Sequence, residues 1–129
     1  MPANTQPIFT LTPRADVAQV TTANTARDGS GTPVTICTAG ANGTRIDLVR
    51  ICATGTTTAG VVRLFIHNGT SAFLYDEILV SAITPSTTVA VFEADYRPAE
   101  PIVLPTGYSL RATTHNTETF NILVHGGDY

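Results

Sequence analysis

Short runs of alternating apolar and polar residues recur along almost the whole sequence, separated by turns rich in Gly, Pro, Asn and Asp. Eight or nine such runs follow one another at a spacing of about ten residues. Successive side chains of a strand point to opposite faces, so this alternation is typical of β-strands, and no window keeps the period of a long helix. The pattern predicts an all-β, single-domain β-sandwich, jelly-roll-like, with about eight strands.

The N-terminal stretch departs from this pattern. Three prolines fall within residues 1–16, where they remove backbone donors, so we expect an extended N-terminal arm over 1–16 and a β-sandwich domain over 17–129. The apolar anchors of the arm are Ile8, Phe9 and Leu11. The arm is either a frayed terminus that docks loosely or a segment that reaches a neighbouring subunit.

The longest hairpin signal lies in GVVRLFIHNGTSAFLYDEILV, residues 60–80. Asn68-Gly69 favours a two-residue loop, which would place Leu64 opposite Phe73 and Val62 opposite Tyr75. One face of this hairpin is then apolar and belongs to the core. The other face carries Arg63, His67 and Asp76 beside Phe65 and Leu74, with Arg63 able to pair with Asp76 across the strands, so we expect a partner sheet or a neighbouring subunit to cover part of it.

Further strands are expected at 17–25, 32–39, 45–53, 87–95, 102–104, 108–114 and 119–125. A shift in the apolar phase between Leu48 and Val49 suggests a β-bulge or burial on both faces. Gly126-Gly127 is expected to begin a loose tail.

Composition excludes several classes of function. The net charge is −3, there is no Lys, and the seven Arg residues form no basic run, so the sequence lacks the footprint of a nucleic-acid-binding protein. No apolar stretch is long enough to predict a membrane span, and no secretory signal is recognisable at the N-terminus. Cys37 and Cys52 are expected to be buried free thiols in neighbouring strands.

Catalytic, cofactor-binding and metal-binding motifs are not recognisable, and we expect neither an enzyme nor a cofactor. His67, His115 and His125 are scattered rather than spaced as metal ligands. Carbohydrate binding stays open, because β-sandwiches bind sugars with exposed aromatic side chains. The sequence contains four tyrosines that could serve, namely Tyr75, Tyr96, Tyr108 and Tyr129.

Two segments, RIDLVRICATGTTTAGVVRLFIHNG (45–69) and LPTGYSLRATTHNTETFNILVHGGDY (104–129), resemble small virion structural proteins of tailed bacteriophages and prophages. Members with known roles include head decoration, or cement, proteins with jelly-roll-like sandwiches. The resemblance implies a non-catalytic protein of the capsid surface, made in the host cytoplasm. Its expected partners are the major capsid protein and further copies of itself, as a dimer or trimer.

The resemblance leaves other functions open. A tail or baseplate module, including one that contacts host glycans, would have the same kind of fold, and an enzyme of unknown reaction is a third hypothesis. For the capsid hypothesis the candidate interface residues are Ile8, Phe9, Leu11, Arg63, His67 and Asp76.

Overall fold

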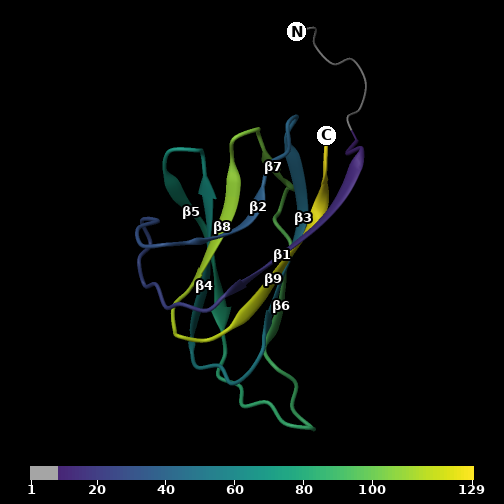
Figure 1. Cartoon of the computed structure of the whole chain (residues 1–129). Coiled ribbons are helices and arrows are strands. Elements are labelled where there is room, and N and C mark those ends of the chain that lie inside the picture. Colours follow the sequence, from purple (N-terminus) through teal and green to yellow (C-terminus); the bar gives the residue numbers. More distant parts are fainter. Residues whose placement is uncertain (1–8) are drawn as a thin grey trace, which may run out of the picture.

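The computed structural model describes residues 9–129, which form two antiparallel sheets packed on one core (Figure 1). In the first sheet the order is β1 (Thr12–Val20), β9 (Phe120–Asp128), β3 (Thr44–Ala53) and β6 (Glu93–Tyr96), and β7 (Ile102–Leu104) also pairs with β3. In the second sheet the order is β2 (Val34–Thr38), β8 (Ser109–Thr114), β4 (Gly60–His67) and β5 (Ala72–Val80). The predicted all-β sandwich is confirmed.

The strands pair in a nested way. β4 pairs with β5, β3 with β6 and β7, β2 with β8, and β1 with β9. The chain therefore doubles back on itself as one long two-stranded ribbon, with the β4–β5 turn at its tip. Two further pairings, of β3 with β9 and of β4 with β8, join neighbouring parts of the ribbon into the two sheets.

The core consists of the inward-facing side chains of both sheets. Fully buried aliphatic residues of β3 and β9 meet those of β4 and β8, and the Phe92 and Phe120 rings pack edge to face with centroids 6.4 Å apart. Each buried aliphatic side chain contributes about 2 kcal/mol relative to exposure. The principal core residues are Ile46, Val49, Ile51, Val62, Leu64, Leu110, Ile122 and Val124.

Strand β1 begins at Thr12, inside the stretch that the sequence predicts as an arm. Pro13 is tolerated there because β1 lies at the edge of its sheet and pairs only with β9, opposite Gly127. The Leu11 amide also donates to the Asp128 carbonyl at 2.7 Å, so backbone pairing reaches back to Leu11. The sandwich therefore starts earlier than residue 17.

The two glycines near the C-terminus do not begin a loose tail. Gly126 and Gly127 continue β9, which lies between β1 and β3. A Cβ on Gly126 would overlap the Arg45 carbonyl of β3. Glycine is required here because the backbones of β9 and β3 approach each other closely. The prediction of a loose tail at Gly126-Gly127 is therefore wrong.

The expected bulge in β3 is confirmed, with the shift in register against β9 falling between Ile46 and Leu48. The strand predicted over 87–95 is much shorter, because only Glu93–Tyr96 pairs with β3. Upstream, the Ser86 hydroxyl accepts a hydrogen bond from the Thr88 amide, and the Ser86 amide donates to the Val89 carbonyl. These local bonds compete with strand pairing.

The register of the β4–β5 hairpin differs from the prediction. The loop has four residues, because the Asn68 side chain accepts from the amides of Thr70 and Ser71 and His67 pairs with Ala72. A bulge in β5 then adds one more residue. Leu64 therefore faces Asp76 instead of Phe73.

The same shift places Ile78, not Tyr75, opposite Val62. Val62 and Leu64 are buried in the core as expected, whereas Phe73 and Tyr75 are exposed near the tip of the hairpin. The apolar face of the hairpin is thus only partly a core face.

Candidate functional site

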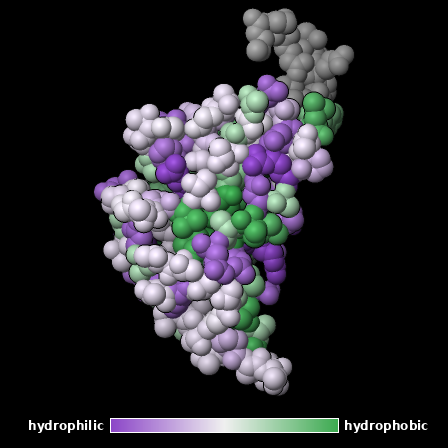
Figure 2. Space-filling view, in the orientation of Figure 1, coloured by the Kyte–Doolittle hydropathy of each residue, from purple (hydrophilic) through white to green (hydrophobic). Residues whose placement is uncertain are grey.

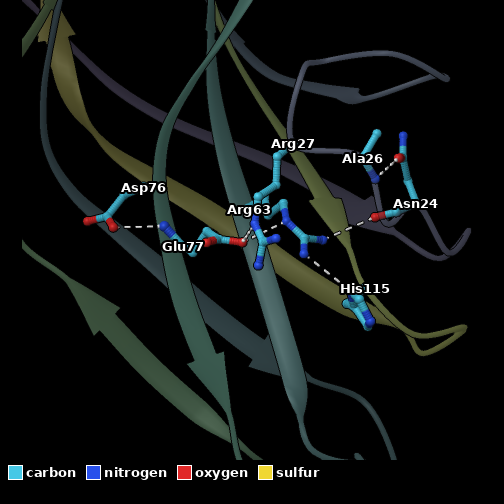
Figure 3. A network of polar contacts seen from close by, with 7 residues as sticks. All are labelled: Asn24, Ala26, Arg27, Arg63, Asp76, Glu77 and His115. Carbon is cyan, nitrogen blue, oxygen red and sulfur yellow. Dashed lines mark hydrogen bonds and ion pairs between the residues drawn. The ribbon is translucent and has the colours of Figure 1, made fainter.

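Arg63 is the largest fully buried side chain, with a relative exposure of 1%. It lies on the outer face of the second sheet, between the core residues Val62 and Leu64. Its Nε donates to Glu77 Oε2 at 2.8 Å, and its Nη1 donates to the Asn24 carbonyl at 3.3 Å (Figure 3). We call these residues, together with Arg27 and His115, the Arg63 network. A buried guanidinium is stable only with such partners.

The segment between β1 and β2 covers this face. The Asn24 amide donates to the Thr114 carbonyl of β8, and a Cβ on Gly29 would meet the Ala72 Cβ of β5. The expectation that something covers the mixed face of the hairpin is therefore met by the chain itself. The predicted site residue Arg63 is shielded by its own chain instead of presented to a partner.

Glu77 joins two arginines. Its Oε2 accepts from Arg27 Nε at 3.0 Å as well as from Arg63 Nε. The hydrogen bond from Arg27, and then that from Arg63, hold the pKa of the Glu77 carboxyl below its usual value of 4.5. Arg27 itself is largely exposed, with 66% of its side chain accessible.

His115 completes the network from the turn after β8. Its Nδ1 lies 3.2 Å from Arg63 Nη2. An arginine can only donate, so Nδ1 accepts and the neutral ring carries its proton on Nε2. The His115 amide also donates to the Val61 carbonyl, which fixes the turn beside β4.

The turn before β4 is clamped to the turn after β8. Glu118 accepts from both the amide and the hydroxyl of Thr58, and Asn116 Nδ2 donates to the Ala59 carbonyl at 3.2 Å. A Cβ on Gly60 would meet Asn116 Nδ2, so the two turns touch. These hydrogen bonds hold the two turns together next to the Arg63 network, and we call the joined turns the wall.

An open cavity of about 330 Å³ lies against this wall. It combines a cationic floor with an apolar rim, because exposed Leu79, at 79% exposure, stands at its mouth. The lining residues are Arg27, Ala59, Gly60, Val61, Arg63, Leu79 and His115.

The predicted ion pair between Arg63 and Asp76 is wrong. The bulge turns Asp76 toward the face of Leu64, while Glu77 takes the place opposite Arg63. Asp76 instead lies near Tyr96 of the first sheet, and burial together with hydrogen bonding to this carboxylate raises the pKa of Tyr96. Tyr75 packs edge to face on Tyr96, with ring centroids 6.3 Å apart. These three residues close one side of the sandwich.

The other predicted interface residues are not brought together. His67 ends β4, and its Nδ1 accepts from the Gly69 amide at 3.0 Å. Phe9 and Leu11 are 78% and 83% exposed at the start of the described chain, and Ile8 lies outside the described residues. Figure 2 shows hydrophobic atoms at this end of the described chain.

A second charged cluster closes the opposite side of the sandwich. Arg14 Nη1 donates to the Thr38 carbonyl at 2.7 Å and to Asp128 Oδ1 at 3.0 Å, and Arg14 Nη2 lies 2.7 Å from Asp16 Oδ2. Thr44 Oγ1 donates to Asp128 at 2.6 Å. We call this set the Arg14 network. It ties β1, β3 and β9 to β2.

Both cysteines are free, as expected, but only Cys37 is buried, whereas Cys52 is half-buried. They also lie in different sheets, Cys37 in β2 and Cys52 in β3. Burial and the nearby Asp16 carboxylate raise the pKa of the Cys37 thiol to about 12. Among residues 9–129, no group of His, Cys, Asp and Glu is arranged to hold a metal ion.

Sequence reasoning missed Asn24, Arg27, Glu77 and His115 as neighbours of Arg63. One signal was present: an arginine in the middle of the apolar run VVRLFI has to find buried partners. Which partners it finds depends on segments about 40 residues before it and 50 residues after it, as the separations of 39 to Asn24 and 52 to His115 show.

Comparisons with protein-family models, with curated proteins and with solved structures found no match. In the part of the chain that the structure describes, no helix is long and apolar enough to cross a membrane.

Proposed function

We propose that this chain is a virion structural protein of a tailed bacteriophage, a decoration protein that binds the assembled shell of major capsid protein. The nested strand pairing supports a jelly-roll topology, an architecture used by viral capsid proteins. The resemblance of residues 45–69 and 104–129 to small virion proteins points the same way.

The observation that supports this proposal most directly is the pair of exposed apolar side chains at the start of the described chain. The Leu11 amide is anchored to the Asp128 carbonyl, yet the Phe9 and Leu11 side chains extend into solvent. Burial of each against a partner would contribute about 2 kcal/mol, so the two together suit a lasting contact. An anchored backbone with exposed apolar side chains is suited to clasp a neighbouring subunit.

A decoration protein stabilises a shell by mass action. It binds the assembled lattice better than free subunits, so its binding energy is added to the stability of the shell. Binding at local symmetry axes favours a dimer or trimer of this chain.

The experiment is co-sedimentation with undecorated heads. We expect saturable binding by the natural chain and a loss of more than tenfold in affinity in the double variant Phe9→Ser, Leu11→Ser, since each tenfold step corresponds to about 1.4 kcal/mol. Val103→Ser is the matched control, because Val103 is also exposed but lies on β7. Absence of co-sedimentation over a wide range of concentrations would refute the proposal.

A tail or baseplate module is the second candidate. The exposed aromatic side chains of Phe73 and Tyr75 on β5 favour it, since sugar rings stack on such surfaces. Immunogold labelling at the tail, together with binding on a glycan array that Tyr75→Ala abolishes, would support this alternative. Labelling of the head would exclude it.

A further inference from the structure

We propose that the cavity beside the Arg63 network receives the carboxylate of an acidic side chain from a partner protein, with an apolar neighbour of that side chain resting on Leu79. The identity of the partner as a capsid subunit rests on the proposed function. The chemistry of the site does not, and follows from the lining residues.

The first step is charge. Arg27 and Arg63 supply two positive charges, Glu77 supplies one negative charge to both, and His115 is neutral while it accepts from Arg63. One positive charge therefore stays uncompensated at the floor of the cavity. Asp28 and Glu118 accept hydrogen bonds from Ser30 and Thr58 and keep their negative charges, but they are not among the residues that line the cavity. The balance fits a monoanion; a phosphate dianion would face an excess of negative charge beside Glu77.

The second step is donor supply. Within residues 9–129, Arg27 uses only its Nε, toward Glu77, so both of its Nη groups are available. Two parallel N–H groups of a guanidinium match the two oxygens of a carboxylate. Arg63 is too deeply buried to contact a ligand directly, and it acts by fixing Glu77 and His115. Arg27 is thus the contact residue and Arg63 a positioning residue.

The third step is the rim. Ala59, Val61 and Leu79 line the cavity, and among the described residues no Phe, Tyr or Trp side chain does. Aliphatic side chains pack well against an aliphatic neighbour, whereas a sugar ring would have no aromatic platform here. A protein segment with an acidic and an aliphatic residue fits better than a glycan. The clamp of Asn116 and Glu118 on the preceding turn keeps the cavity preformed, which lowers the cost of binding.

The test uses the full chain and 4-methylpentanoate, which joins a carboxylate to an isobutyl group. We expect saturable NMR shifts of the Leu79 methyl groups and the Arg27 Nε–H. Affinity should be about tenfold lower for the isosteric 4-methylpentanamide and for inorganic phosphate. Arg27→Gln should lose the preference for the carboxylate. Arg97→Gln, the same charge change at another exposed arginine, should keep it.

Equal binding of the acid and the amide, an unchanged preference in Arg27→Gln, or no saturable shift would overturn the proposal. Tighter binding of glucuronate than of 4-methylpentanoate would overturn the choice of a protein partner. Co-sedimentation of Arg27→Gln with heads separates the two proposals. If the natural chain and Arg27→Gln bind heads equally well, the carboxylate site is refuted and the decoration role stands. If neither chain binds heads but 4-methylpentanoate binds, the decoration role is refuted and the carboxylate site stands.

Discussion

The two arginine networks use the same chemistry for different ends. Arg14 lies between the sheets at the edge of the sandwich, and its partners come from four strands, β1, β2, β3 and β9. Arg63 lies outside the sandwich, under the segment between β1 and β2, and its partners lead to an open cavity. The first network closes an edge, whereas the second supports a surface.

The contrast shows how burial and exposure divide roles within one network. Inward-pointing charges on an edge strand, such as Arg14 and Asp16 on β1, also discourage pairing with other chains. In the Arg63 network the buried member fixes positions, and the exposed member, Arg27, keeps donors for a ligand. Five variants sharpen or break this comparison.

The largest loss of stability is expected from Arg63→Ala. The change leaves a cavity on the outer face of the second sheet and takes the shared partner from Glu77 and His115, so we expect a loss of about 3 kcal/mol. Urea unfolding followed by tyrosine fluorescence measures it. Arg111→Ala is the control, because Arg111 lies on the same face but its side chain donates only to Ser109 among the described residues. Equal losses in both variants would contradict the structural role of Arg63.

Gly126→Ala tests the close backbone packing beside the Arg14 network, since Gly126 pairs with Arg14 across β1 and β9. The added Cβ would overlap the Arg45 carbonyl, and we expect a loss of about 2 kcal/mol in urea unfolding. Gly55→Ala is the matched control, because nothing lies within 4 Å of its Cβ position. An Ala at 126 that leaves stability unchanged would show that β9 and β3 can move apart at no cost.

Thr44→Val removes the hydroxyl that connects Asp128 with the Gly40 amide. Thr44 is buried, so the loss of its bonds should lower stability by about 1 kcal/mol. The isosteric change leaves packing intact, and thermal unfolding by circular dichroism measures the effect. Thr70→Val, at an exposed loop position, should have no comparable effect.

The hydrogen bonds to Asp128 also make the stability of the chain depend on pH. Hydrogen bonds from Thr44 and Arg14 hold the pKa of Asp128 below its usual value of 3.8. A depressed folded-state pKa means that the stabilisation is complete above the usual value and is lost as the pH falls through the folded-state pKa. The stability difference between the natural chain and Asp128→Asn should therefore shrink below about pH 3.8. In the Thr44→Val background the decline should be smaller and should end at a higher pH, because the folded-state pKa of Asp128 then lies closer to its usual value.

Arg27→Gln should have the smallest effect on stability. Its ion pair with Glu77 is largely solvent-exposed, and such pairs contribute little. Urea midpoints of the variant and the natural chain should agree within the error of the titration, while the preference for the carboxylate over the amide is lost. A marked loss of stability would move Arg27 from the ligand-binding role to the structural one.

Local chemistry predicted much of the fold. Alternating patterns identified β2, β3, β7, β8 and β9 to within a few residues, and the shift near Leu48 predicted the bulge in β3. The order of the strands could not be predicted, because it is decided by pairings such as β1 with β9 that join distant segments.

The hairpin shows where such reasoning fails. Asn68-Gly69 does mark a turn, with Gly69 at a φ of 94°, but the Asn68 side chain accepts two backbone amides and opens the loop to four residues. The bulge in β5, which follows this loop, then placed Glu77 instead of Asp76 opposite Arg63. The cover over Arg63 has no apolar pattern of its own, so the cavity had no signal in the sequence beyond the misplaced arginine.

The nested pairing of the strands has a consequence for synthesis on the ribosome. β9 is made after β1 and β3, and it lies between them in the finished sheet. Until it has emerged, β1 lacks the strand with which it pairs, and one edge of β3 lacks its neighbour. The first sheet therefore cannot close until β9 has been made, and until then the unpaired edges of β1 and β3 can pair with other chains and aggregate.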